Sequence, residues 1–125
     1  NLKAPVFVAQ QSAPLMRENG GGNIINIASV HTRATLPEAA PYAAAKGGVE
    51  MMTKSMAIEF APLGIRINAV SPGPTKTARF QATRVTDPVK MDSSRKSFNR
   101  YAEPDEIADA GNEPDIRRIL FGFIQ

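Results

Sequence analysis

A tyrosine and a lysine stand four residues apart in "PYAAAKGG" at residues 41–48. If this stretch is helical, Tyr42 and Lys46 lie one turn apart on the same face. A free phenol loses its proton only near pH 10, so it transfers protons poorly at neutral pH unless a nearby cation stabilises the phenolate. The lysine ammonium supplies that charge. The pair therefore indicates acid–base chemistry, and the alternative is an interfacial tyrosine beside a solvated lysine.

A serine strengthens the acid–base interpretation. Ser29 ends the apolar run "NIINIAS", thirteen residues before Tyr42. The run is rich in β-branched residues and predicts a strand buried on both faces, as in parallel sheets. Open α/β sheets bind their ligands at the carboxyl ends of strands. We therefore expect Ser29, Tyr42 and Lys46 to meet at one edge of a sheet.

The elements that must position these side chains follow from periodicity and from helix and strand stops. The predicted elements are helices over residues 2–18 and 42–61, strands over 23–29 and 65–73, and a further helix from residue 103. Pro14 is expected to weaken the end of the first helix, and Pro41 fits the first turn of the second. Residues 74–100 are expected to form a long loop. Helix, strand, helix, strand is the order of a βαβ crossover in a doubly wound α/β sheet.

The composition excludes several kinds of protein. The chain has 125 residues, of which 42% are hydrophobic and 22% charged, and no apolar run approaches the ~18 residues of a membrane span. It contains no cysteine and one histidine, so disulfides and a zinc site are not expected, and no metal is predicted. A net charge of +3 without stacked aromatics among clustered basic residues does not indicate nucleic-acid binding. The cytoplasm is the default expectation for location.

The sequence resembles the short-chain dehydrogenase/reductase family over residues 1–110. The matching stretches are "NL" at the start, "GGNIINIAS", "YAAAK", "GIRINAVSPG" and "EPDEIA". "KGG", "MTKSMA" and "EFAPLGIRIN" are most similar to glucose 1-dehydrogenase-like members. The resemblance implies the carboxyl-side part of a doubly wound Rossmann-type parallel sheet, incomplete. The amino-terminal half, with the glycine-rich phosphate loop and four strands, is expected to be missing, which would leave one strand edge unpaired.

The resemblance also implies roles for individual residues. Tyr42 corresponds to the catalytic acid/base, and Lys46 to the residue that stabilises its phenolate and binds the cofactor ribose. Ser29 corresponds to the residue that holds the substrate oxygen, and Asn1 to the one that holds a water in the proton relay. The further candidates for contacting NAD or NADP are Pro72, Gly73, Thr75 and Thr77 of "SPGPTKT". His31 is expected either near the substrate or as a polar surface residue.

The implied function is hydride transfer between NAD(P) and an alcohol or carbonyl substrate such as glucose or a similar sugar. The alternatives are a 3-oxoacyl carrier-protein reductase and an inactive fragment, and the 125-residue chain alone is expected to be inactive. The full-length protein is expected to be a homo-oligomer. Residues 1–110 are expected to form a partial dehydrogenase domain. Residues 111–125 diverge from the family, for which a slip of the reading frame is one explanation.

Overall fold

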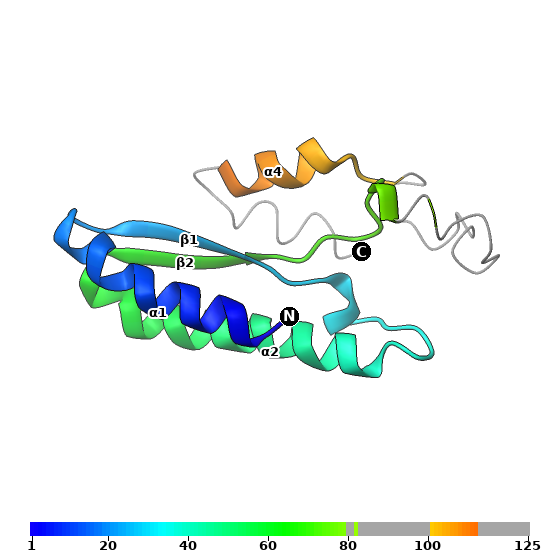
Figure 1. The fold of residues 1–125 in the computed structure, drawn as a ribbon, viewed down its shortest axis with the longest axis horizontal. Helices are drawn as coiled ribbons and strands as arrows, with labels where there is room; N and C mark the ends of the chain where they lie inside the picture. The colour runs from blue at the N-terminus through cyan, green and yellow to red at the C-terminus, as the bar shows by residue number, and fades with distance from the viewer. Residues whose placement is uncertain (80–81, 83–100, 113–125) are drawn as a thin grey trace. The chain divides into compact units, whose positions relative to one another are not determined.

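The structure is a computed structural model that describes residues 1–79, 82 and 101–112 (Figure 1). The chain divides into two units, Asn1–Ser71 and Pro72–Gln125, each described here by itself. In the part of the chain that is described, no helix is long and apolar enough to cross a membrane.

The first unit begins with helix α1, Lys3–Glu18, as the three- and four-residue spacing of apolar residues predicts. Ala9 and Ala13 lie on its buried face. Pro14 lies inside the helix and does not end it. Gln10, whose carbonyl loses its partner at Pro14, is exposed together with Pro14, so water can satisfy that carbonyl. The expected weakening near Pro14 is therefore not seen in the extent of α1.

Glycines make the turn from α1 into the first strand. Gly21 has a φ of 123°, and a Cβ built on it would lie 2.4 Å from the carbonyl oxygen of Gly64. Only glycine fits this backbone conformation and this close approach. The turn therefore places the start of the first strand beside Gly64, the residue that directly precedes the second strand.

The two strands are parallel and form the sheet of the described residues. Strand β1 is Gly22–Ile27 and β2 is Ile65–Val70, paired in register from Gly22 with Ile65 to Ile27 with Val70. Helix α2, Ala40–Phe60, and the short 3-10 helix η2, Ala61–Leu63, connect them. This is the predicted βαβ unit, with Pro41 in the first turn of α2.

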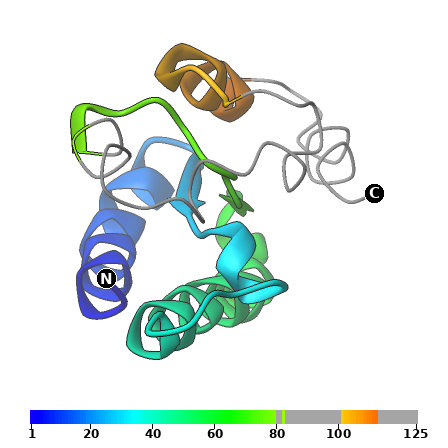
Figure 2. The same ribbon diagram turned by 90° about the vertical axis from the view of Figure 1, so that its right-hand side faces the viewer.

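Both helices of the first unit pack on one face of the sheet (Figure 2). The main core joins α1, α2 and β2, and its buried members are Ala9, Ala13, Met56, Ile65 and Ile67. Ala28, Val49 and Ala69 form a second buried cluster. The expectation that the first strand is buried on both faces is wrong within the described residues, since Ile27 is 48% exposed. Alternate strand residues face opposite sides, and α1 and α2 cover only the side that Ile24 and Asn26 face.

The second unit contains helix α4, Pro104–Asn112, where the sequence predicts a helix from residue 103. Before the helix, Thr75 forms a parallel bridge with Ala102, and Lys76 forms an ion pair with Glu103. The backbone N–H of Glu103 donates to the carboxylate of Glu106 at 2.8 Å, which caps the start of the helix. Most of the long loop predicted over 74–100 and of the divergent tail lies outside the described residues.

Candidate active site

Ser29 lies two residues beyond the end of β1 and begins the turn to α2. It is the N-cap of the 3-10 helix η1, Val30–Thr32, and its Oγ accepts a hydrogen bond from the backbone N–H of His31 at 3.3 Å. The Ser29 side chain is buried. Because Oγ accepts from His31, the hydroxyl proton of Ser29 remains available for donation to another oxygen. The strand and its cap thus fix a hydroxyl donor at the carboxyl end of β1.

Tyr42 and Lys46 lie one turn apart in α2, as the sequence predicts. The Lys46 ammonium lies 5.9 Å from the centroid of the Tyr42 ring. The same ammonium donates a hydrogen bond of 2.6 Å to the backbone carbonyl of Ile27, two residues before Ser29. Tyr42 is 40% exposed, so its ring can be reached by a ligand. Lys46 therefore links the tyrosine-bearing helix to the end of the strand that precedes Ser29.

His31 completes the connection between Ser29 and Tyr42. Its ring packs edge-to-face on Tyr42, with 5.4 Å between centroids and 87° between planes. Nδ1 of His31 lies 3.2 Å from the Thr35 hydroxyl, which holds the imidazole from the other side. Backbone and ring of this one residue thus contact Ser29 and Tyr42 respectively. The sequence analysis placed His31 near the substrate or on the surface; the contact with Tyr42 was not foreseen.

Asn1 precedes the residue through which α1 packs on α2. A Cβ built on Gly48 would lie 2.8 Å from Cδ2 of Leu2, so Leu2 covers this glycine. Gly48 follows Lys46 by two residues. The chain start is therefore held beside the turn of α2 that carries Lys46. The proposed role of Asn1 in a proton relay stays a prediction.

The predicted cofactor-contacting residues Pro72, Gly73, Thr75 and Thr77 belong to the second unit. Thr75 Oγ1 donates to the carbonyl of Gly73 at 3.0 Å, and the backbone N–H of Thr77 donates to the carbonyl of Thr75 at 2.8 Å. These bonds fold the segment into a compact turn. Their contact with a cofactor stays a prediction.

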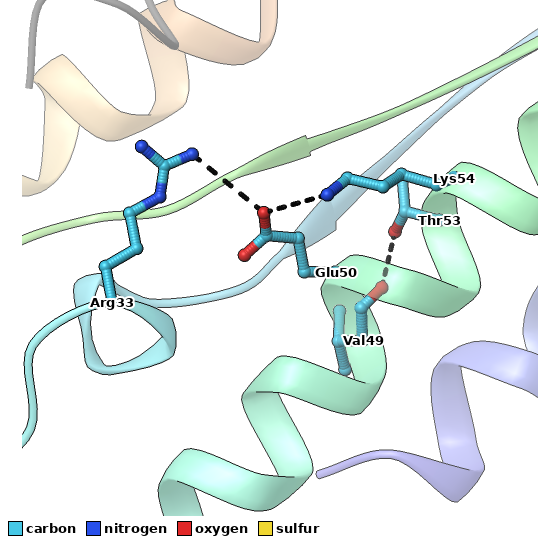
Figure 3. A network of polar contacts seen from close by, with 5 residues as sticks. All are labelled: Arg33, Val49, Glu50, Thr53 and Lys54. Carbon is cyan, nitrogen blue, oxygen red and sulfur yellow. Dashed lines mark hydrogen bonds and ion pairs between the residues drawn. The ribbon is translucent and has the colours of Figure 1, made fainter. Parts of the chain in front are cut away.

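The sequence analysis missed the polar contacts that join α2 to β1 and to the turn after η1. Asn26 in β1 donates from Nδ2 to the Thr53 hydroxyl of α2 at 2.9 Å, and Thr53 donates to the carbonyl of Val49 at 2.7 Å. Glu50 of α2 pairs with Arg33 in the turn after η1 (Figure 3). An asparagine inside an apolar strand run is a signal for the first contact, because a buried amide needs a partner.

The side chains of the site offer free hydrogen-bond donors to a ligand. An ammonium has three N–H donors, and Lys46 donates one of them to the backbone carbonyl of Ile27. The remaining donors, together with the exposed Tyr42 hydroxyl, suit a ligand rich in hydroxyl groups. Within the described residues, no group of three or more His, Cys, Asp or Glu side chains could hold a metal ion.

A parallel βαβ unit with Ser, Tyr and Lys at the carboxyl end of its first strand places the chain among Rossmann-type α/β proteins. A sequence model described as "Enoyl-(Acyl carrier protein) reductase" matches residues 1–111. The chain belongs to the short-chain dehydrogenase/reductase family of oxidoreductases.

Individual relatives support this assignment. Glucose 1-dehydrogenase 2 of Bacillus subtilis is 33% identical over 96 residues, which are 77% of this chain and 37% of the relative. The crystal structure of a gluconate 5-dehydrogenase from Burkholderia cenocepacia, in complex with NADP and tartrate, matches with a TM-score of 0.78 and 38% identity, over 86% of this chain and 42% of that one. A 7α-hydroxysteroid dehydrogenase complexed with NADH and 7-oxo glycochenodeoxycholic acid matches with a TM-score of 0.79, at 27% identity, over 88% of this chain and 43% of that chain. The chain spans about two fifths of the length of the curated relatives that it matches.

Proposed function

We propose that this chain is the catalytic part of an NAD(P)-dependent oxidoreductase that interconverts a secondary alcohol and a carbonyl. The observation that carries the proposal is the placement of Tyr42. The Lys46 ammonium lies 5.9 Å from the centroid of its ring, and the His31 ring packs on it at 5.4 Å in a T-shaped arrangement. The backbone N–H of His31 in turn donates to Ser29 Oγ. A phenol beside a cation and near a hydroxyl donor is an arrangement suited to moving a proton at a carbonyl oxygen.

In this proposal the chain's own residues bind and protonate, while the nicotinamide supplies the hydride chemistry when bound. Tyr42 gives a proton to the substrate oxygen in the reductive direction and takes it back in the oxidative direction. Lys46 stabilises the phenolate that forms in between. Ser29, which accepts from His31, donates its own proton to the same substrate oxygen and holds it in place.

Sugars and sugar acids are the substrate class best supported by the relatives. Glucose 1-dehydrogenase 2 and a gluconate 5-dehydrogenase are both among them. The two structural relatives were solved with NADP and with NADH, so either dinucleotide remains a candidate. His31 beside Tyr42 offers a polar ring that can reach a further hydroxyl of such a substrate.

A second candidate is reduction of a 3-oxoacyl group on a carrier protein. The matching family model is described as an enoyl-(acyl carrier protein) reductase, which shares with this candidate the acyl chain on a carrier protein but acts at a carbon–carbon double bond. The two candidates differ in what surrounds the reacting carbon, and both use Tyr42, Lys46 and Ser29 in the same way.

The test uses a chimera in which residues 1–111 replace the matching segment of the Burkholderia cenocepacia gluconate 5-dehydrogenase, hereafter the chimera. We expect it to oxidise gluconate with NADP, and Tyr42→Phe to lower kcat by about 10²–10⁴-fold, as loss of a general acid–base group does. The ring and its contact with His31 remain in this variant, so circular dichroism should be unchanged. A folded Tyr42→Phe chimera that keeps more than about a tenth of the activity would contradict the assignment.

The 125-residue chain by itself is proposed to be inactive. Positioning of the nicotinamide draws on binding energy gathered along the whole dinucleotide. The chain matches only about two fifths of its relatives' length. Calorimetric titration of the isolated chain with NAD and with NADP checks this, and micromolar affinity for either would refute it.

A further inference from the structure

The turn that carries Ser29 and His31 contacts α2 at a second place, one turn of helix beyond Lys46. Glu50 follows Lys46 by four residues and therefore continues the side of α2 that bears Tyr42 and Lys46. Its Oε1 lies 3.9 Å from Nη2 of Arg33, the residue that directly follows η1 (Figure 3). Lys54 approaches the same oxygen at 3.4 Å from within the helix. Of these two cations, only Arg33 ties the helix to the turn.

Glu50 is also the better placed of the partners to act on the turn. Its side chain is 21% exposed, against 51% for Arg33 and 63% for Lys54, so it is the most shielded of the three. The neighbouring Thr32 hydroxyl is the main cause that lowers the pKa of Glu50, followed by Lys54 and Arg33 and opposed by partial burial. Among the described residues, the buried hydroxyl of Thr32 has no hydrogen-bond partner. The ion pair with Arg33 is therefore the contact that ties Glu50 to the turn. Both Thr32 and Arg33 belong to the turn that begins at Ser29.

We propose that Glu50 is a positioning residue, which through its ion pair with Arg33 holds the turn against α2 and so fixes Ser29 relative to Tyr42. The inference rests on the proposed function. Ser29 is joined to the turn by the N–H of His31, and the His31 ring sits on Tyr42. The His31 contact and the Glu50 contact therefore hold the two ends of one short turn on one helix. Without the Glu50 contact, only the His31 ring holds the turn on α2, so its position on Tyr42 becomes looser. Small misplacements of reacting groups lower catalytic rates strongly.

The test measures the chimera and four variants, of which one is a control. Glu50→Gln keeps the shape of the side chain and removes its charge, and Arg33→Met removes the only cation of the pair that lies in the turn. We expect each to lower kcat about three- to fivefold with an unchanged KM for NADP, because a contact of this kind contributes ~1 kcal/mol at most, which is about fivefold. The double variant should be no slower than the worse single variant, since both remove the same contact.

Lys54→Met is the matched control. It removes a cation that lies closer to Glu50 than Arg33 does, 3.4 Å against 3.9 Å, but that cannot connect the helix to the turn, so kcat should stay within about twofold of the parent. If Lys54→Met and Arg33→Met slow the enzyme equally, or if Glu50→Gln leaves kcat unchanged, the proposal is wrong. A loss of activity that appears only as a raised KM for NADP, with kcat unchanged, would also overturn it.

A spectroscopic measurement separates this proposal from the proposed function. In the chimera labelled with ¹³C-histidine, the signal of His31, assigned with His31→Asn, reports the Tyr42 ring beside it. Glu50→Gln should shift that signal toward the position of a free histidine, while Lys54→Met leaves it in place. If the His31 signal does not move in Glu50→Gln, the positioning role of Glu50 is refuted whatever the activity. Full activity of Tyr42→Phe would instead overturn the proposed function and leave the shift of the His31 signal standing.

Discussion

The ammonium of Lys46 donates a hydrogen bond of 2.6 Å to the backbone carbonyl of Ile27. The N–H of Ala28 donates to Val70 of β2, so the polar groups of the preceding residue point away from β2, toward the other edge of β1. Lys46 thus satisfies a carbonyl at an edge that no strand of the described residues pairs. One N–H of the ammonium is used in this way and two can serve a ligand.

Replacing Lys46 by Met should therefore weaken dinucleotide binding as well as turnover. A hydrogen bond to a charged group contributes ~1.5–3 kcal/mol, so we expect the chimera to lose about 10–100-fold in affinity for NADP. Calorimetric titration measures this directly, and Lys54→Met on the same helix is the control. Unchanged affinity together with a lower rate would show that Lys46 does not hold the ribose.

Thr53 is expected to contribute to stability chiefly through its hydroxyl. Thr53→Val keeps the shape of the side chain but leaves the buried amide of Asn26 without its partner, which should lower the free energy of unfolding by about 1–3 kcal/mol. Thr53→Ser retains the hydroxyl and should lose less, because it removes only one methyl group. Urea unfolding of the chimera compares the two variants. If Thr53→Ser lost stability and Thr53→Val did not, packing of the methyl group, and not the bond to Asn26, would stabilise this position.

The local order of the elements could be predicted because each is written in short-range patterns. The spacing of Ala9 and Ala13, Pro41 at the start of a helix, and the β-branched run before Ser29 each depend on neighbours in sequence. The burial of Ile27 could not be predicted in this way, since it depends on which faces of the sheet are covered.

The same limit applied to the site. The spacing of Tyr42 and Lys46 follows from helical geometry, so the pair could be identified from the sequence. The contacts of His31 with Tyr42 and of Glu50 with Arg33 join a turn to a helix. They depend on how the chain between residues 33 and 40 folds back, which no periodic pattern encodes.

The two adjacent glycines of α2 should respond differently to alanine. A Cβ at Gly47 meets nothing within 4 Å, so Gly47→Ala should raise the free energy of unfolding by ~0.5–1 kcal/mol through helix propensity. A Cβ at Gly48 would lie 2.8 Å from Leu2, which must move, so Gly48→Ala should gain less. Urea unfolding of both variants tests this. Equal gains would argue that Leu2 does not pack on Gly48, and Leu2→Ala should restore the gain at Gly48 if it does.

Glu50 should make stability depend on pH in the acid range. Its pKa is lowered below the ordinary 4.5, mainly by the Thr32 hydroxyl, so the ionised form is favoured in the folded state. The stabilisation is then complete above 4.5 and is lost as the pH falls through the lower folded pKa. The difference in unfolding free energy between the parent and Glu50→Gln, ~0.2–1 kcal/mol near neutral pH, should shrink on acidification. A difference that stays constant or grows as the pH falls would contradict the assigned direction.

Exposed apolar residues on both helices predict self-association. Met51 and Ile58 of α2 are 64% and 78% exposed, and Phe7 and Leu15 of α1 are 51% and 64% exposed. Val49 and Met56 of α2 are already buried in the two core clusters, so Met51 and Ile58 form a separate surface. Large apolar side chains that stay exposed on helices are typical of a surface that binds another subunit. We expect the chimera to sediment as a homo-oligomer at micromolar concentration, and Ile58→Lys to shift it toward monomer.

Glu59→Lys, which changes the next and already polar position, should leave the assembly intact. A chimera that sediments as a monomer, or an Ile58→Lys variant that assembles like its parent, would show that these side chains do not form the interface.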